Sequence, residues 1–293
     1  MRLLVDLLKS MRPRQWTKNL LVFAALLFAQ KAFDPRAVAE AVEAFVIFCV
    51  LAGAMYLIND CLDVERDRLD PIKRHRPVAS GRVSVGTAVS AASVLTVAGL
   101  YASLWSGGWL LLAICASYVA ITLSYSLFLK HVLIVDVFCV ASGFVLRAVA
   151  GAAAIRAEIS PWLIICTLLL SLFLALAKRR GEIMTLGEEA ASHRATLGEY
   201  STELLDQMIS VMTASTLMSY ALYTISDRTV AMVGSTRLLY TIPFVIYGIF
   251  RYLYLVHEKD MGGHPDRALL RDWPLMINIL LYALAAGLII YFR

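Results

Sequence analysis

The stretch NDCLDVERD, which begins at Asn59, places several carboxylates at a spacing that suits metal chemistry. An α-helix advances about 100° per residue, so Asp63 and Asp67 fall within about 60° of Asp60 around the helix axis. Glu65 falls about 140° from Asp60 on the other side and is not a natural member of the group. The spacing therefore predicts one acidic stripe along the end of a helix.

Three carboxylates on one face repel one another unless a cation lies among them. Oxygen ligands without Cys or His suit Mg²⁺ better than zinc, and bound Mg²⁺ often keeps open positions for substrate phosphates. We therefore expect Asn59, Asp60, Asp63 and Asp67 to be metal ligands, and the three aspartates to be catalytic residues at a diphosphate site. The alternative is a solvated helix end that faces basic loop residues.

A basic run follows the acidic stretch and could bind phosphate oxygens that the metal does not reach. Lys73 would act as a point charge, whereas Arg74 and Arg76 can bind phosphate in bidentate fashion. All three could instead be loop residues that mark the cytoplasmic side of a membrane. Further polar residues near predicted helix ends are candidates for substrate binding: Lys18, Tyr56, Tyr125, Lys130, His131, Lys178, Arg179 and Glu182.

Each of these further candidates has a structural alternative. Lys18 could anchor the chain at the membrane boundary, and the two tyrosines could pack in the core. Lys130 could interact with the negative end of a helix dipole. Lys178 and Glu182, four residues apart, could form a surface ion pair worth about a few tenths of a kcal/mol.

Two ionisable residues, Asp136 and Arg147, fall inside predicted membrane spans. Charged side chains are unfavourable in a bilayer unless they are paired or line a wet cavity. We expect both residues to contact substrate, with Asp136 facing a cavity and Arg147 holding an anion. Arg147 could alternatively extend its side chain to the outer surface.

The composition places the chain in a bilayer: 60% of the residues are hydrophobic, 17% are charged, and the mean hydropathy is +0.71. Soluble domains do not hide that much apolar surface. Nine spans are predicted in one transmembrane domain that covers residues 1–293, near 15–33, 39–59, 84–105, 108–128, 132–153, 161–177, 208–226, 236–256 and 273–292.

The basic residues predict the orientation of the spans. Most of the 27 Lys and Arg residues fall in alternate segments, including the N-terminal one and the loop after the acidic stretch. Such residues accumulate on the cytoplasmic side, so we expect a multi-pass protein of the bacterial plasma membrane with a cytoplasmic N-terminus and active site. The first apolar run is read as a retained helix, and the five cysteines as packing residues.

The acidic stretch resembles the first NDxxDxxxD motif of the UbiA superfamily of intramembrane prenyltransferases. Three further segments resemble elements of that family: RPRQWTKN (12–19), SYSLFLK (124–130) and LRAVAG (146–151). The resemblance implies an all-α membrane fold of nine transmembrane helices around a cavity open to the cytoplasm, in which Mg²⁺ binds a diphosphate.

The sequence departs from many members of that family at the segment after the sixth span. A second acidic motif, DxxxD, is typical there, but this chain has LAKRRGEIMTLGEE. With DPIKRHRPVASG (70–81) and GGHPDRALLRD (262–272), this basic segment resembles the branch that transfers 5-phosphoribose from phosphoribosyl pyrophosphate (PRPP) to a decaprenyl-type polyprenyl phosphate, toward arabinose donors for cell-wall synthesis. The lipid phosphate is already an anion, so the reaction needs no general base.

Two other functions remain open at the level of sequence. A prenyltransferase that acts on an aromatic acid could use Arg147 to bind the carboxylate, although the basic segment counts against it. A transporter would also carry ionisable residues in its spans, but Gly/Pro-broken spans repeated in two halves are not evident. Motifs for nucleotide or zinc hydrolases are absent, nucleic acid is not an expected partner, and a homo-oligomer is possible.

Overall fold

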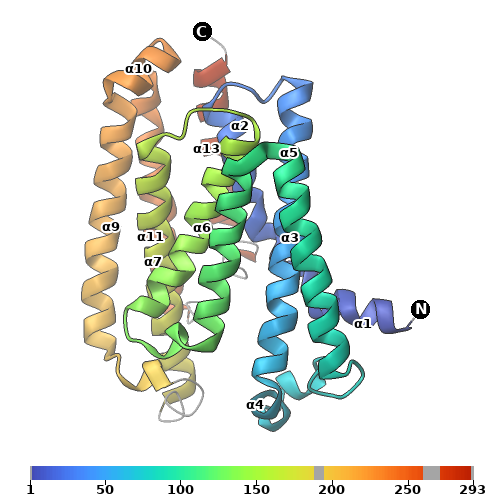
Figure 1. Cartoon of the computed structure of the whole chain (residues 1–293). Helices are drawn as coiled ribbons and strands as arrows, with labels where there is room; N and C mark the ends of the chain where they lie inside the picture. Colours follow the sequence, from blue (N-terminus) through green and yellow to red (C-terminus); the bar gives the residue numbers. More distant parts are fainter. Residues whose placement is uncertain (1, 188–194, 260–270, 292–293) are drawn as a thin grey trace. The chain divides into compact units, whose positions relative to one another are not determined.

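The chain is all-helical in the part that the structure describes (Figure 1). The structure is a computed structural model, and it describes residues 2–187, 195–259 and 271–291. The described chain forms two compact units: Met1–Lys130 with Ser142–Ile159, and His131–Ala141 with Ser160–Arg293. The single domain expected over residues 1–293 stays a prediction.

The first unit is built around two long apolar helices, α3 and α5. Its elements are α1 (Arg2–Ser10), the 3₁₀ helix η1 (Pro13–Phe23), α2 (Ala24–Phe28), α3 (Pro35–Leu62), α4 (Val64–Leu69), η2 (Lys73–His75), α5 (Val85–Leu127) and, from Ser142, the later part of α6 (Val135–Ala154). The 3₁₀ turn η3 (Leu129–His131) follows α5.

Small side chains let α3 and α5 pack closely. Ala44 and Ala54 on α3 and Ala88 and Ala92 on α5 are fully buried. A Cβ atom on Gly99 of α5 would lie 2.7 Å from a methyl carbon of Leu51. Helices in lipid associate by this kind of van der Waals packing, because lipid tails are as apolar as the side chains.

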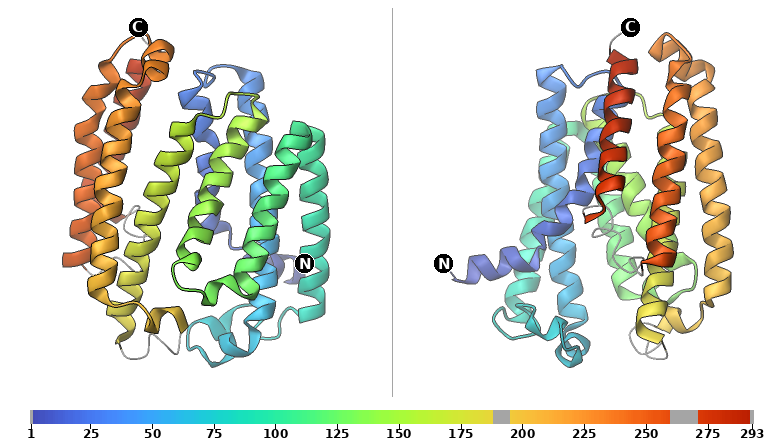
Figure 2. Two further views of the ribbon diagram at one scale, coloured as in Figure 1. Left: turned by 60° about the vertical axis from the view of Figure 1, so that its left-hand side comes forward. Right: turned by 180° about the vertical axis from the view of Figure 1, so that it is seen from behind.

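Helix α5 contains two of the predicted spans. It has 43 residues, and at 1.5 Å per residue it would be about 65 Å long, about twice the apolar thickness of a bilayer. Gly108 breaks it with φ +69° and ψ −162°, values that a residue with a side chain rarely adopts. Figure 2 shows the two legs of α5 side by side.

The first predicted span, 15–33, does not form one continuous α-helix. It consists of η1, with 11 residues, and α2, with 5 residues. The backbone of η1 lies directly against α6, since a Cβ atom on Gly151 would lie 1.9 Å from the carbonyl oxygen of Val22. Hydropathy alone does not distinguish this packed segment from a span that faces lipid.

The second unit consists mainly of long helices that run beside one another. They are α7 (Pro161–Leu186), η5 (Ala195–Gly198), α9 (Thr202–Ile225), α10 (Asp227–Val233), η6 (Arg237–Thr241), α11 (Ile242–Glu258) and α13 (Trp273–Tyr291). Helices α7 and α9 lie side by side in Figures 1 and 2, and their buried face includes Phe173, Leu176, Leu205 and Ile209.

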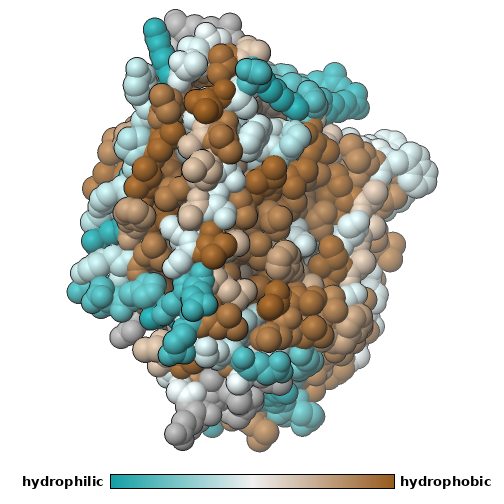
Figure 3. All heavy atoms as spheres, turned by 90° about the vertical axis from the view of Figure 1, so that its left-hand side faces the viewer, coloured by the Kyte–Doolittle hydropathy of each residue, from teal (hydrophilic) through white to brown (hydrophobic). Residues whose placement is uncertain are grey.

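Seven helices in the described residues are long and apolar enough to cross a membrane. Their outer faces are apolar as well: Val211, Met218 and Leu222 on α9 are all more than two-fifths exposed. Figure 3 shows a face on which hydrophobic side chains cover much of the middle and hydrophilic ones gather toward the two ends. The chain is therefore a multi-pass membrane protein with the expected all-α architecture, although the nine spans do not correspond one for one to nine helices.

Candidate active site

The acidic stretch lies at the end of α3 and the start of α4. Helix α3 ends at Leu62, and Asp63 caps it with φ −97° and ψ 10° before α4 begins at Val64. The side chains of Asp60 and Asp67 remain on one side of this bend and are almost fully buried, with 2% and 3% exposure. Glu65 is 81% exposed and pairs with Arg68, so it points away as expected.

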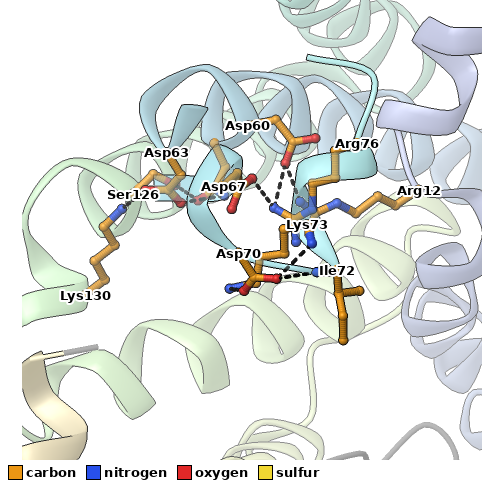
Figure 4. Close-up of polar contacts among 11 residues, drawn as sticks. Arg12, Asp60, Asp63, Asp67, Asp70, Ile72, Lys73, Arg76, Ser126 and Lys130 are labelled. Carbon is orange, nitrogen blue, oxygen red and sulfur yellow. Dashed lines mark hydrogen bonds and ion pairs between the residues drawn. The ribbon is translucent and has the colours of Figure 1, made fainter. Parts of the chain in front are cut away.

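Two arginines contact the buried acids of this stretch (Figure 4). Nη2 of Arg12 donates a hydrogen bond to Oδ1 of Asp60. Nη1 of Arg76 donates to the same oxygen at 3.3 Å and to Oδ2 of Asp67 at 2.6 Å. One guanidinium therefore lies between two carboxylates, and one carboxylate oxygen accepts from two guanidiniums.

Asp63 has a different set of partners. Nζ of Lys130, beyond the end of α5, lies 2.7 Å from Oδ1 of Asp63. Nδ2 of Asn59 donates to Oδ2 of Asp63 at 3.0 Å, and Oδ1 of Asn59 accepts from the hydroxyl of Ser126 at 3.3 Å. The asparagine and the lysine thus hold the third carboxylate between α3 and the end of α5.

The basic run after the acidic stretch does not act as one group. Nζ of Lys73 lies 3.2 Å from Oδ2 of Asp70, whose Oδ1 accepts from the backbone N–H groups of Ile72 and Lys73 at 2.9 and 2.8 Å. Burial by itself raises the pKa of Asp70, but these hydrogen bonds and the lysine charge together lower that pKa to about 2. Arg74 is exposed, so Arg76 is the member of the run that the structure brings to the acidic stretch.

Four further predicted residues of the site lie on the surrounding elements. The ring of Tyr56, one turn before Asp60, lies under the guanidinium of Arg12, with 4.7 Å from Cζ to the ring centre. Lys18 is half-buried in η1, and Tyr125 is half-buried near the end of α5. His131 is exposed at the end of η3.

Arg147 lies inside the first unit, not at its surface. It is 7% exposed, and its guanidinium donates to Oδ1 of Asn19 at 2.6 Å, to the carbonyl of Gly143 at 2.7 Å and to the hydroxyl of Tyr118 at 3.0 Å. The rings of Tyr118 and Phe144 lie 4.8 and 5.6 Å from Cζ, within the range of cation–π contact. These contacts tie η1 to α5 and α6 around a buried charge.

The predicted residues of the second unit form a separate polar group. Asp136, which is fully buried, accepts from Nε of Arg179 at 2.9 Å and from the hydroxyl of Tyr200 at 3.1 Å. Nη1 of Arg179 also donates to Glu182 at 2.6 Å, and Nζ of Lys178 lies 3.6 Å from the same carboxylate group. Asp136 is thus paired within the protein, which is the condition that its burial requires.

The donor chemistry of the acidic stretch fits Mg²⁺, since it consists of carboxylate and amide oxygens. In the described part of the chain, no three His, Cys, Asp or Glu side chains converge closely enough to hold a metal ion. A cation nevertheless already lies between Asp60 and Asp67, namely the guanidinium of Arg76. The two carboxylates therefore present oxygens to one shared positive charge.

The structure adds several residues to the site that were not predicted from the sequence. Arg12 stands first in the quoted segment RPRQWTKN, and Asn19 follows directly after that segment's Lys18. Ser126 lies in SYSLFLK, while Tyr118 and Tyr200 lie in no quoted segment. Their contacts join distant parts of the chain, which a local motif does not reveal. Of the predicted segment 262–272, residues up to 270 lie outside the described part.

A match to the model of a known protein family shows to which family this chain belongs. The model described as the UbiA prenyltransferase family matches residues 20–290, nearly the whole chain. The chain belongs to the UbiA prenyltransferase family. In the structure, the acidic stretch lies at the end of α3 and LRAVAG lies on α6.

Three bacterial relatives of this UbiA chain carry the name decaprenyl-phosphate phosphoribosyltransferase. The protein of Mycolicibacterium smegmatis is 37% identical over 99% of this chain and 94% of its own length. Those of Corynebacterium glutamicum and Mycobacterium tuberculosis are 36% and 33% identical, over 97% and 99% of this chain and 86% and 96% of their own.

Solved structures of UbiA proteins share the fold. A UbiA homologue from Archaeoglobus fulgidus bound to GPP and Mg²⁺ has a TM-score of 0.72 and 18% identity, over 97% of this chain and 99% of its own. A digeranylgeranylglyceryl phosphate synthase has a TM-score of 0.71 and 17% identity, over 99% of both chains. The structure of the homologue from Archaeoglobus fulgidus thus holds a divalent metal ion.

Proposed function

We propose that this UbiA-family enzyme transfers 5-phosphoribose from PRPP to a polyprenyl phosphate of the decaprenyl type and releases diphosphate. The observation that carries the proposal is the likeness, over nearly the full length, to three proteins named decaprenyl-phosphate phosphoribosyltransferase. The acidic stretch and the cations around it supply groups suited to a donor that carries a diphosphate. The product would be a precursor of arabinose donors for the cell wall.

Asn59, Asp60, Asp63 and Asp67 would hold Mg²⁺ in this reaction. When bound, the ion would supply positive charge that stabilises the departing diphosphate. Arg12, which no sequence motif singled out, contacts the carboxylate of Asp60, as Arg76 does, and joins the residues proposed for the site.

The other cations of the site would neutralise phosphate oxygens. Arg76 and Lys130 already lie at the carboxylates, where a diphosphate would find them within reach. Lys73 and Arg74 sit on the adjoining loop, and both are solvent-accessible. We assign these four residues to the donor, and Tyr56 to holding Arg12 in place.

The chemical step exchanges one bond at C1 of the ribose for another. The bond between C1 and the diphosphate oxygen breaks with its electron pair on the diphosphate, and C1 becomes oxocarbenium-like. An oxygen of the lipid phosphate then forms the new bond from the opposite face. No proton moves, because the lipid phosphate attacks as an anion. The protein's task is to position both substrates and to balance charge.

The expected orientation also belongs to the proposal. The excess of Lys and Arg in alternate segments supports a bacterial plasma-membrane protein with its N-terminus and the acidic stretch in the cytoplasm, where PRPP is available. The polyprenyl phosphate would enter from the inner leaflet. Arg147 and the group around Asp136 and Arg179 are proposed to serve the lipid phosphate or the ribose 5-phosphate.

Transfer of label from PRPP tests the proposal. Membranes that contain the protein should convert radiolabelled PRPP into a butanol-soluble product when polyprenyl phosphate and Mg²⁺ are present, and EDTA should stop the reaction. Asp63→Ala should abolish the product in a folded protein, whereas Glu65→Ala, in the same stretch but exposed, should retain it. If the label stays water-soluble while a prenyl diphosphate is transferred to an aromatic acid, the proposed reaction is wrong.

A further inference from the structure

The oxygens proposed to bind metal are occupied by side-chain cations of the protein itself. Oδ1 of Asp60 accepts hydrogen bonds from both Arg12 and Arg76, and Oδ2 of Asp67 accepts from Arg76. A metal ion that binds Oδ1 of Asp60 must displace at least one of the two guanidiniums, because both lone pairs of that oxygen already accept N–H donors. Metal binding at this site is therefore a competition between cations.

The charges of the site are balanced before any ligand arrives. Three carboxylates, those of Asp60, Asp63 and Asp67, pair with three cations, those of Arg12, Arg76 and Lys130. A divalent ion that entered alone would add two positive charges beside three existing ones. The carboxylates that would attract the ion are already neutralised by these three cations, so a lone ion gains no net attraction from the site. A diphosphate that enters with the ion removes the imbalance.

The exposure of the side chains shows which partner can move. Asp60 and Asp67 are 2% and 4% exposed at their side chains, whereas Arg12 and Arg76 are each 27% exposed. The two arginines are therefore more accessible to solvent than the acids that they contact (Figure 4). Arg12 sits between α1 and η1 with φ +53°, a left-handed conformation that is uncommon for residues with a side chain. Such strained backbone clusters at clamps and switches.

We infer that Arg12 and Arg76 form a charge latch, which keeps a divalent ion from binding tightly until a diphosphate arrives. The diphosphate draws the two guanidiniums from the carboxylates onto its own oxygens, and the freed carboxylates then bind the ion. Metal and donor therefore bind cooperatively, and the coupling is reciprocal by thermodynamic linkage. The inference rests on the proposed metal-diphosphate site and adds a residue, Arg12, and an order of events.

Binding of Mn²⁺ in the absence of any phosphate compound tests the latch. Free Mn²⁺ is measured by electron paramagnetic resonance in titrations of the purified full-length protein in nanodiscs. Arg12→Gln should bind Mn²⁺ about tenfold more tightly than the wild type, because one competing cation is gone. Arg12→Lys should bind it like the wild type. Arg14→Gln, which removes the same charge from an exposed residue two positions away, should not tighten binding.

A second measurement uses the wild type alone, so the test does not depend on the folding of a variant. Retention of ³²P-labelled pyrophosphate by the wild type should rise at least about tenfold when Mn²⁺ is added. Mn²⁺ binding that is equal in Arg12→Gln and the wild type, or pyrophosphate retention that is independent of Mn²⁺, would overturn the latch. Neither measurement contains PRPP, so failure of the latch is separate from failure of the proposed phosphoribosyl transfer.

Discussion

Lys130 and Asp63 lie 67 positions apart in the chain, yet Nζ of the lysine and Oδ1 of the aspartate are 2.7 Å apart. The lysine lies just beyond the second leg of α5, and the aspartate joins α3 to α4. Because Gly108 reverses α5, the end of that helix returns to the end of α3. The contact therefore links the bend in α5 to the geometry of the acidic stretch.

Replacing Lys130 by Met should impair the proposed reaction through the donor. The change removes a cation from Asp63 and a candidate contact to the diphosphate. We expect kcat/KM for PRPP to fall about a hundredfold, the size seen when one charge-stabilising donor is lost. Radiolabel transfer in membranes measures it. Lys130→Arg should recover part of the activity, and Lys9→Met, at a residue 61% exposed, should have no effect. Full activity in Lys130→Met would remove this lysine from the site.

The stabilisation that the Asp70 carboxylate gives to its turn should change with pH at the acid end of the range. Its pKa is about 2 in the folded protein, below the value of about 4 for an unfolded chain. A lowered pKa means that the carboxylate stabilises the fold at neutral pH and that this contribution disappears as the pH falls from about 4 to about 2. Asp70→Asn should thus melt at a lower temperature than the wild type at pH 7, with a smaller difference at pH 3. A difference that is the same at both values would contradict the assignment.

Gly151 should not tolerate even one added methyl group. A Cβ atom there would lie 1.9 Å from the carbonyl oxygen of Val22, and backbone cannot yield as a flexible side chain can. We expect Gly151→Ala to lower the stability by about 3 kcal/mol or more and to reduce the folded yield on size-exclusion chromatography. Gly86→Ala, where nothing lies within 4 Å of the new atom, is the matched control and should fold normally. Equal yields would show that η1 does not pack as described.

The acidic stretch could be predicted from the sequence because its spacing is local. A helix of known pitch places Asp60 and Asp67 on one side and Glu65 on the other, and the structure has this arrangement, whereas Asp63 lies at the bend between α3 and α4 and pairs with Lys130. The apolar runs likewise predicted an all-α membrane protein, since the hydropathy of a segment depends only on the residues within that segment. That part of the prediction needed no knowledge of distant contacts.

The partners of the acids could not be predicted in the same way. Arg12 lies 48 positions from Asp60, and the contact depends on how η1 packs, which hydropathy does not describe. The prediction of one continuous helix over residues 15–33 was wrong for the same reason, because hydropathy does not describe how this segment packs. Arg147 was expected to need a partner, but its partner Asn19 is a neutral side chain 128 positions away. Charge arguments indicate that a buried ion needs partners and do not identify them.

Tyr200→Phe should destabilise the second unit by removing a hydroxyl that makes two hydrogen bonds. The hydroxyl donates to the buried Asp136 at 3.1 Å and accepts from the backbone N–H of Ile134 at 3.0 Å, a β-branched residue with φ +67°. Loss of these bonds should lower the stability by about 1–3 kcal/mol. Tyr240→Phe, at a residue 71% exposed, should leave the melting temperature unchanged.

The same tyrosine gives a test at high pH. Burial, and then the charge of Asp136, raise the pKa of Tyr200 to about 12, above the value of about 10 expected in an unfolded chain. A raised pKa means that the hydroxyl contributes its full stability below pH of about 10 and loses it as the pH rises toward about 12. The difference in melting temperature between the wild type and Tyr200→Phe should therefore shrink between pH 9 and pH 11. A difference that stays constant or grows over that interval would show that Tyr200 does not hold Asp136 and Ile134 together through its neutral hydroxyl.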